Sequence, residues 1–122
     1  MKYTSLNDAA HDPLVRSDIR TALAEGETEV WYRKEHAGAL FGIEDPNSDA
    51  LEATHALIGK VASKDLDKLF MALQGDFWSP CGEANGLMQA SGAQHTSISV
   101  GDVLVIDGEA NIVRGTGFEI LH

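Results

Sequence analysis

The sequence has little cysteine and no long apolar run. Its 122 residues include one cysteine, Cys81, which has no second cysteine with which to form an internal disulfide. No segment approaches the ~20 consecutive apolar residues of a membrane-spanning helix. The first residues, Met1 to Ser5, lack the apolar stretch of a secretory signal. We therefore expect a cytoplasmic protein that does not interact with a membrane.

Basic residues are also scarce. Nine Lys and Arg stand against nineteen Asp and Glu, which gives a formal net charge of -10. A surface of this sign repels phosphate backbones, so we expect no direct binding to DNA or RNA. It attracts a basic partner instead, such as a protein whose own nucleic-acid groove is basic. Acidic charge also keeps proteins soluble, and this plainer interpretation needs no partner.

The motifs of common catalytic and metal sites are absent from the sequence. No Cys-x-x-Cys pair occurs and no two histidines are four residues apart, so we expect no metal ion. The chain has no Gly-x-Ser-x-Gly elbow and no glycine loop followed by the lysine of a phosphate site. Cys81 and His95 alone do not indicate a nucleophile and its base. We predict no catalytic residues and no cofactor.

The composition is that of one globular domain. Hydrophobic residues make up 43% of the chain and charged residues 23%, and no linker or repeat divides residues 1–122. The polar residues 1–12 are expected to be flexible unless they dock on the rest. Helix and strand patterns are mixed, so we predict an α+β fold. It would combine an antiparallel sheet, which could curl toward a barrel, with three to four short helices.

The N-terminal half of the chain predicts one helix and three strands. Asp12 is a suitable helix cap and Pro13 is favoured at a first helical position. Two segments rich in strand formers flank a polar loop and predict an antiparallel hairpin, at 29–33 and 39–43. The predicted helix is 13–25, and a third strand is predicted at 54–62, where a helix is the alternative.

The C-terminal half predicts two helices and a hairpin. Leu66, Leu69, Phe70 and Leu73 have helical spacing between the possible cap Ser63 and the helix-ending Gly75. A shorter helix is predicted over 82–90. The Asp-Gly pair at 107–108 is a strong type I′ hairpin signal between strands 103–106 and 110–113. A last strand is predicted at 118–121.

Polar side chains that could form a site gather in the stretch 95–102 and near Trp78. Hydroxyl, imidazole and carboxyl groups can bind a phosphate, a base edge or a peptide backbone. The same stretch also fits an edge strand whose hydroxyls face water, with Ile98 and Val100 pointing inward. Likewise Trp78 can simply cover the core, and Glu83 can favour a helix N-terminus. The candidate binding residues are Trp78, Glu83, His95, Thr96, Ser97, Ser99 and Asp102.

Short motifs along residues 54–121 carry a family resemblance. They are Thr54 and His55, Gly59 to Val61, Asp65 and Leu66, Phe70, Gln74 and Gly75, Trp78 to Pro80, Gly82 to Ala84, His95 to Ser97, Ser99 to Val103, and Gly117 with Phe118. In order and spacing they resemble a family of uncharacterised small phage and plasmid proteins. The C-terminal half is similar to the YodL-like domains of conjugative elements. Cys81 and Ile98 depart from the pattern, since relatives carry asparagine and methionine there. The resemblance implies a mobile-element setting and supplies no reaction.

Three hypotheses of function follow. The leading one is a non-enzymatic accessory protein of a phage or mobile element, whose acidic face docks on a basic host or element protein. One form would be an anti-CRISPR-like inhibitor of a nucleic-acid-handling defence complex that imitates the charge of DNA. The first alternative is a small ligand-binding or nucleotide-binding domain that uses a strand at 95–102. The second is an assembly subunit that pairs an apolar strand edge between chains, at 103–106 or 40–43.

Overall fold

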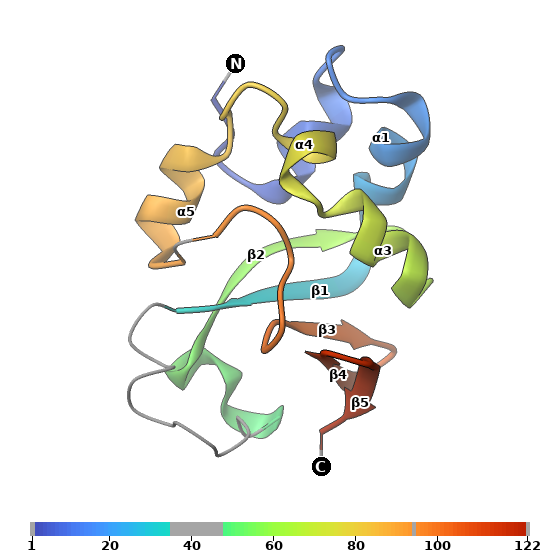
Figure 1. Cartoon of the computed structure of the whole chain (residues 1–122), viewed down its shortest axis with the longest axis vertical. Coiled ribbons are helices and arrows are strands. Elements are labelled where there is room, and N and C mark those ends of the chain that lie inside the picture. Colours follow the sequence, from blue (N-terminus) through green and yellow to red (C-terminus); the bar gives the residue numbers. More distant parts are fainter. Residues whose placement is uncertain (1, 35–47, 94, 122) are drawn as a thin grey trace.

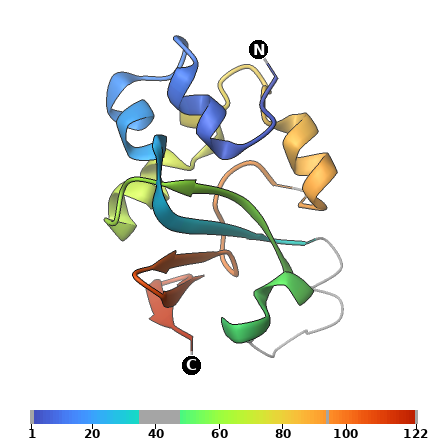
Figure 2. The same cartoon turned by 180° about the vertical axis from the view of Figure 1, so that it is seen from behind.

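The computed structural model describes residues 2–34, 48–93 and 95–121 (Figure 1). One open antiparallel sheet has the strand order β2-β1-β3-β4-β5. The described residues also form four α-helices and two 3-10 helices, η1 and η2. The predicted α+β class is therefore confirmed, and the sheet does not close into a barrel. The four α-helices gather at the end of the molecule that holds the N-terminus, and β3 to β5 lie toward the C-terminus (Figures 1 and 2).

The first helix of the chain is not the one predicted at 13–25. Helix η1 (Leu6–His11) precedes it, and Leu6 and Ala9 of η1 are buried in the core. Helix α1 (Ser17–Leu23) begins four residues later than predicted. Asp12 caps only a turn, in which its backbone carbonyl accepts from Val15. The predicted helix start was wrong because the same Asp-Pro signal fits an isolated turn.

Strand β1 (Glu25–Arg33) pairs with β2 (His55–Val61) on one side and with β3 on the other. The strands predicted at 29–33 and 54–62 are thus confirmed. The partner predicted at 39–43 lies outside the described residues. Gly26 belongs to β1, and it lies directly against the backbone of Val61 and Ala62.

Three helices follow β2, with starts that differ from the predicted ones. Helix α3 (Leu66–Ala72) is capped by Asp65, whose carboxylate accepts from two backbone N–H groups, rather than by Ser63. Gly75 opens a separate turn, α4 (Gly75–Trp78), instead of simply ending α3. Helix α5 (Asn85–Ser91) ends at Gly92 with φ 87°, the positive angle that glycine accepts at a helix C-terminus.

The hairpin predicted around Asp107 and Gly108 is confirmed. These residues have φ 51° and 82° and connect β3 (Val103–Ile106) to β4 (Glu109–Arg114). Two positive φ angles at the centre of a two-residue loop are the signature of a type I′ turn. Strand β5 (Gly117–Ile120) then pairs with β4 and forms one edge of the sheet.

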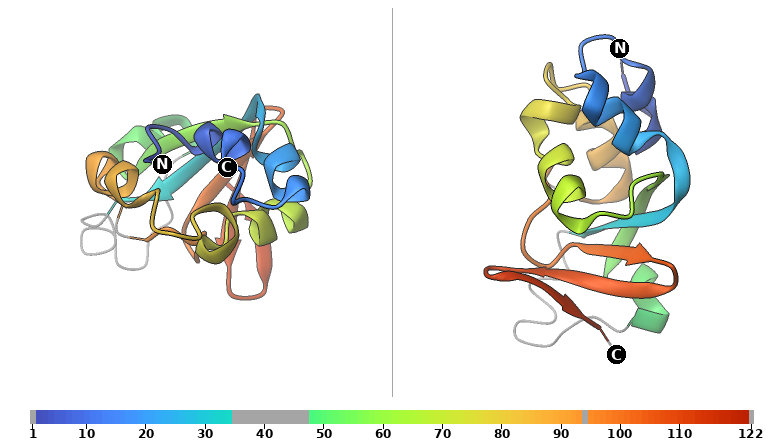
Figure 3. Two further views of the ribbon diagram at one scale, coloured as in Figure 1. Left: turned by 90° about the horizontal axis from the view of Figure 1, so that it is seen from above. Right: turned by 90° about the vertical axis from the view of Figure 1, so that its right-hand side faces the viewer.

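The sheet has a hydrophobic cluster on each face. The larger one packs the helices against alternate strand residues such as Tyr32 and Leu104. The smaller one uses the residues between them, including Trp31 and Val103, together with Leu51 of η2 (Ser48–Ala53). The side view in Figure 3 shows the α-helices gathered above the sheet. Because successive residues of a strand face opposite sides, each strand serves both clusters.

Strand β3 has a hydrogen-bonded neighbour on both sides, β1 and β4. Both edges of β3 are therefore occupied, and the hypothesis that residues 103–106 offer a free strand edge to another chain was wrong. The other strand named in that hypothesis, residues 40–43, lies outside the described residues. Within the part of the chain that the structure describes, no helix is long and apolar enough to cross a membrane.

The close approach of β1 to the chain after β2 predicts a large difference between two identical substitutions. Gly26→Ala places a methyl group into the backbone of Val61 and Ala62, so we expect it to lower the free energy of unfolding by about 1–3 kcal/mol. Gly86→Ala in α5 meets no atom within 4 Å and should raise it by up to about 1 kcal/mol. Urea denaturation of both variants measures this, and equal effects would contradict the close approach.

Candidate functional site

Asp102 is a fully buried carboxylate just before β3. Its Oδ1 accepts from the backbone N–H of Arg33 at 2.8 Å, and its Oδ2 accepts from the backbone N–H of Ser99 at 2.8 Å. Nε2 of His95 lies 2.9 and 2.7 Å from the two oxygens. These contacts offset the cost of burying the charge, and they join the end of β1 to the loop at 95–102.

His95 is fixed on two sides. Its ring stacks on that of Tyr32, with centroids 4.8 Å apart and planes 11° apart. Because Nε2 faces the Asp102 carboxylate, it carries the proton, and Nδ1 has no partner among the described residues. The side chain is 27% exposed. His95 therefore presents one fixed ring nitrogen, Nδ1, that has no partner among the described residues.

A second histidine, which the sequence did not single out as a site residue, supports the same loop. Nε2 of His55 lies 2.7 Å from the carbonyl oxygen of Gly101, and Nδ1 lies 2.7 Å from the Thr54 hydroxyl. The carbonyl can only accept, so Nε2 donates, and in the neutral ring Nδ1 accepts from the Thr54 hydroxyl. Burial lowers the pKa of His55 below its usual value, which favours this neutral form.

The stretch 95–102 is an irregular loop rather than the predicted strand, and Val100 is exposed at 52% instead of pointing inward. The carbonyl of Thr96 accepts from the Tyr32 hydroxyl at 2.8 Å and from Trp78 Nε1 at 2.9 Å. Burial and the nearby Asp102 charge raise the pKa of Tyr32 well above its usual value, so the phenol remains a donor. Trp78 therefore lies beside this loop.

The hydroxyl groups of the loop are used mainly to hold it in place. Ser97 Oγ accepts from the backbone N–H of Gly75 at 2.7 Å, and Ser99 Oγ donates to the Ser97 carbonyl at 2.9 Å. The Thr96 residue lines an open hollow beside α5 that none of the other predicted site residues lines. Two of the three loop hydroxyls, those of Ser97 and Ser99, thus have structural partners already.

Glu83 belongs to a different cluster from the other predicted residues. Its Oε1 accepts from the backbone N–H of Cys81 at 2.6 Å, and its carbonyl accepts from the backbone N–H of Tyr3. The Tyr3 hydroxyl donates to Asp12, and the Tyr3 ring stacks on Trp78. Burial alone would raise the pKa of Asp12, but hydrogen bonds from Leu14 N–H and Tyr3 lower it. Trp78 lies between this cluster and the His95 loop, because its ring stacks on that of Tyr3 and its Nε1 donates to the Thr96 carbonyl.

Four exposed carboxylates form what we call the acidic end: Glu27, Asp65, Asp107 and Glu109. Lys64 directly precedes Asp65 in the chain, and its Nζ lies 2.8 Å from Asp107 Oδ1. Asp107 and then Glu27 raise the pKa of Lys64, and Glu109 lines the same hollow as Lys64 and Asp107. In Figure 1 the start of α3 and the arrowhead of β3, which belong to the acidic end, both lie on the right-hand side of the view. Together with the ammonium of Lys64, these four carboxylates carry a net charge of -3.

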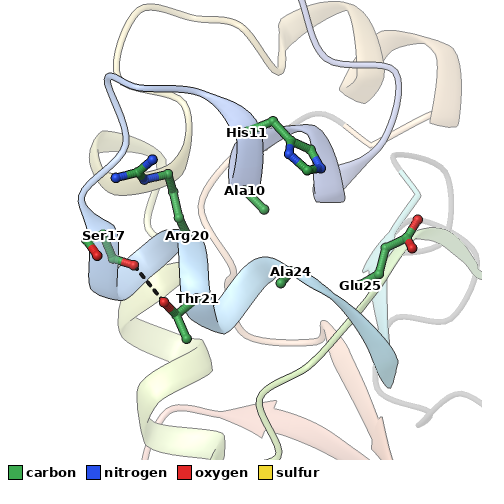
Figure 4. Close-up of a pocket in the computed structure, with 7 residues that line it drawn as sticks. All are labelled: Ala10, His11, Ser17, Arg20, Thr21, Ala24 and Glu25. Carbon is green, nitrogen blue, oxygen red and sulfur yellow. Dashed lines mark hydrogen bonds between the residues drawn. The ribbon is translucent and has the colours of Figure 1, made fainter.

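A further open hollow of about 490 Å³ lies between η1 and α1 (Figure 4). Its charged residues do not converge, since Arg20 and Glu25 lie at opposite ends and the one hydrogen bond drawn joins Thr21 to Ser17. Nowhere in residues 2–34, 48–93 and 95–121 do three or more His, Cys, Asp or Glu side chains form a group that could hold a metal ion.

Comparison with protein-family models, with curated proteins and with solved structures found no match to this chain. The site must therefore be interpreted from its own geometry. That geometry brings Trp78, His95, Thr96, Ser97, Ser99 and Asp102 into one connected loop system and leaves Glu83 in another.

The sequence analysis missed the residues that reach the loop from other elements. Tyr32 and the Arg33 backbone come from β1, about 70 positions before Asp102. The adjacent Thr54 and His55 were part of the family pattern, and this was the one signal that could have indicated them. The acidic end draws its members from β1, the start of α3 and the β3–β4 hairpin, so no local motif marks it.

We predict that Asp102→Asn destabilises the protein by about 2–4 kcal/mol. Each Asp102 oxygen accepts a backbone N–H, so the new amide must aim its own N–H at one of these donors. The control is Asp76→Asn on the exposed side of α4, which should change stability by less than about 0.5 kcal/mol. Chemical denaturation followed by tryptophan fluorescence measures both. A loss no larger than that of the control would show that the Asp102 contacts contribute little.

The lowered pKa of His55 predicts that stability falls with acidification. The unfolded chain binds a proton at the ordinary histidine pKa of about 6.5, whereas the folded chain resists it. This contribution to stability is complete above about pH 6.5 and decreases below it, by at most about 1.4 kcal/mol per pH unit. The free energy of unfolding is measured in urea at pH 7.5 and at pH 5.5. Its decrease from pH 7.5 to pH 5.5 should be smaller in His55→Gln than in the unaltered protein. The other histidines are common to both proteins, and equal falls would refute the assignment.

Proposed function

We propose that this protein acts without catalysis, as an accessory protein of a phage or other mobile element that binds another protein. The acidic end would dock on a basic surface of a host or element protein. The observation that carries this proposal is the acidic end, in which Asp107 pairs with Lys64, Glu27 also raises the pKa of Lys64, and Glu109 lines the same hollow. Charge of this density steers a basic partner toward the protein and fixes its orientation.

The distribution of acidic residues supports a surface role. Three carboxylates, those of Asp12, Glu83 and Asp102, are buried, and each accepts at least one hydrogen bond within the protein. The acidic end, by contrast, is exposed and has the rigid support of a paired hairpin and a helix start. Rigid exposed charge costs little conformational entropy on binding.

A particular form of the proposal is an inhibitor that imitates the charge of DNA, as an anti-CRISPR protein could. The net charge of -10 and the resemblance of residues 54–121 to mobile-element proteins support it. Such a partner would carry a basic nucleic-acid groove and would release its DNA on binding. The ligand-binding alternative has the unpartnered His95 Nδ1 in its favour, but most loop hydroxyls are already bonded within the protein.

Charge reversal tests the docking surface with a matched control. Glu27→Lys with Glu109→Lys changes the net charge by four units, from -10 to -6. Glu52→Lys with Asp76→Lys gives the same net charge on exposed positions outside the acidic end. A partner captured from host lysate and then purified should bind the first variant about tenfold more weakly or worse, and the control variant nearly as well as the unaltered protein.

Salt gives the second measurement. Affinity of the unaltered protein should decrease as ionic strength rises, since the Debye length falls to about 8 Å at 0.15 M. Recovery of no partner would contradict the proposal. So would a complex that is insensitive both to salt and to reversal of the acidic end.

A further inference from the structure

An open hollow of about 350 Å³ lies inside the acidic end, between the start of α3 and the β3–β4 hairpin. Its volume is near the lower limit for ligand pockets, about 300 Å³, so it suits one long side chain better than a large molecule. Six residues line it: Lys64, Leu66, Ile106, Asp107, Glu109 and Asn111. Carboxylates and apolar groups thus share one small surface.

Asn111 lines this hollow and has an unused acceptor. The side chain is 7% exposed, and its Nδ2 donates to the carbonyls of Leu104 and Glu109 at 3.2 and 3.0 Å. These two acceptors fix which end of the amide is nitrogen. Oδ1 has no hydrogen-bond donor among the described residues, and it is not one of the fully enclosed unpaired atoms. It therefore remains open to a donor that enters the hollow.

The other groups of the hollow select the kind of donor. Glu109 has no cationic partner in the described part of the chain, whereas Asp107 is paired with Lys64. Leu66 and Ile106 are half-buried and give the hollow an apolar wall. A ligand that fits would carry positive charge, several N–H groups and an aliphatic stem.

We propose that this hollow receives an arginine side chain of the partner protein, an inference that rests on the proposed function. The guanidinium group would donate to Asn111 Oδ1 and to the Glu109 carboxylate, while the stem packs on Leu66 and Ile106. Arginine fits better than lysine because its planar group has five donors in fixed directions and is weakly hydrated. A lysine ammonium is already supplied to Asp107 by Lys64.

The test uses three short peptides that differ at one central residue, arginine, lysine or citrulline, within a glycine-serine sequence. Each is titrated into the ¹⁵N-labelled full chain, and amide shifts are followed by NMR. The arginine peptide should give saturable shifts at the Asn111 side-chain amide and at residues 106–109. The lysine peptide should bind more weakly, and the citrulline peptide, which lacks the charge, should cause no saturable shift.

A paired variant removes the two negative charges of the hollow without disturbing its turn. Asp107→Asn keeps a residue that tolerates φ 51°, and Glu109→Gln keeps the length of the side chain. Together they should weaken arginine-peptide binding about tenfold or more, whereas Asp76→Asn should leave it unchanged. Unchanged shift dispersion in the spectrum verifies that the variants are folded.

Two results would overturn the inference: equal binding of the arginine and lysine peptides, or shifts spread over the surface without saturation. If either occurs while charge reversal still weakens partner binding, the arginine inference fails and the proposed function stands. If the arginine peptide binds as expected but the partner ignores charge reversal, the proposed function fails instead.

Discussion

The buried carboxylate of Asp102 is the interaction on which the rest of the structure depends. It accepts backbone N–H groups from β1 and from its own loop, and it holds the ring of His95 against Tyr32. A buried charge is stable only when donors surround it, so each of these segments must be in place at once. The loop in turn reaches the helices, because the backbone N–H of Ile98 donates to the Leu73 carbonyl. One side chain thereby links the sheet, the loop and the helical layer.

This requirement explains which parts of the fold could be predicted from sequence. The β3–β4 hairpin follows from the backbone preferences of Asp107 and Gly108, which are local properties of two residues. Helix α3 follows from the spacing of Leu66, Leu69 and Leu73, again a local pattern. Both were predicted correctly in kind, although the α3 cap was assigned to Ser63 instead of Asp65.

The loop at 95–102 could not be predicted in the same way. Its alternation of hydroxyl and apolar residues is a fair strand pattern, yet its N–H and carbonyl groups bond to residues far away in the chain. Its conformation is set by Gly75, Trp78 and Tyr32, whose positions only the folded chain brings together. The candidate residues were recognised as polar, but their partners were not. The acidic end was missed for the same reason, because charge clusters form across elements.

The two polar regions of the molecule lie at opposite ends of β1. Glu27 of the acidic end is near the start of this strand, and Arg33, which bonds to Asp102, is its last residue. Six residues of extended chain separate them by about 20 Å, since a strand rises about 3.3 Å per residue. Screening at physiological salt removes most of the direct interaction between exposed charges over that distance. Substitutions at the two ends should therefore act independently, as distant sites usually do. The fold can thus use buried carboxylates to hold its loop while exposed carboxylates at the other end remain available to a partner.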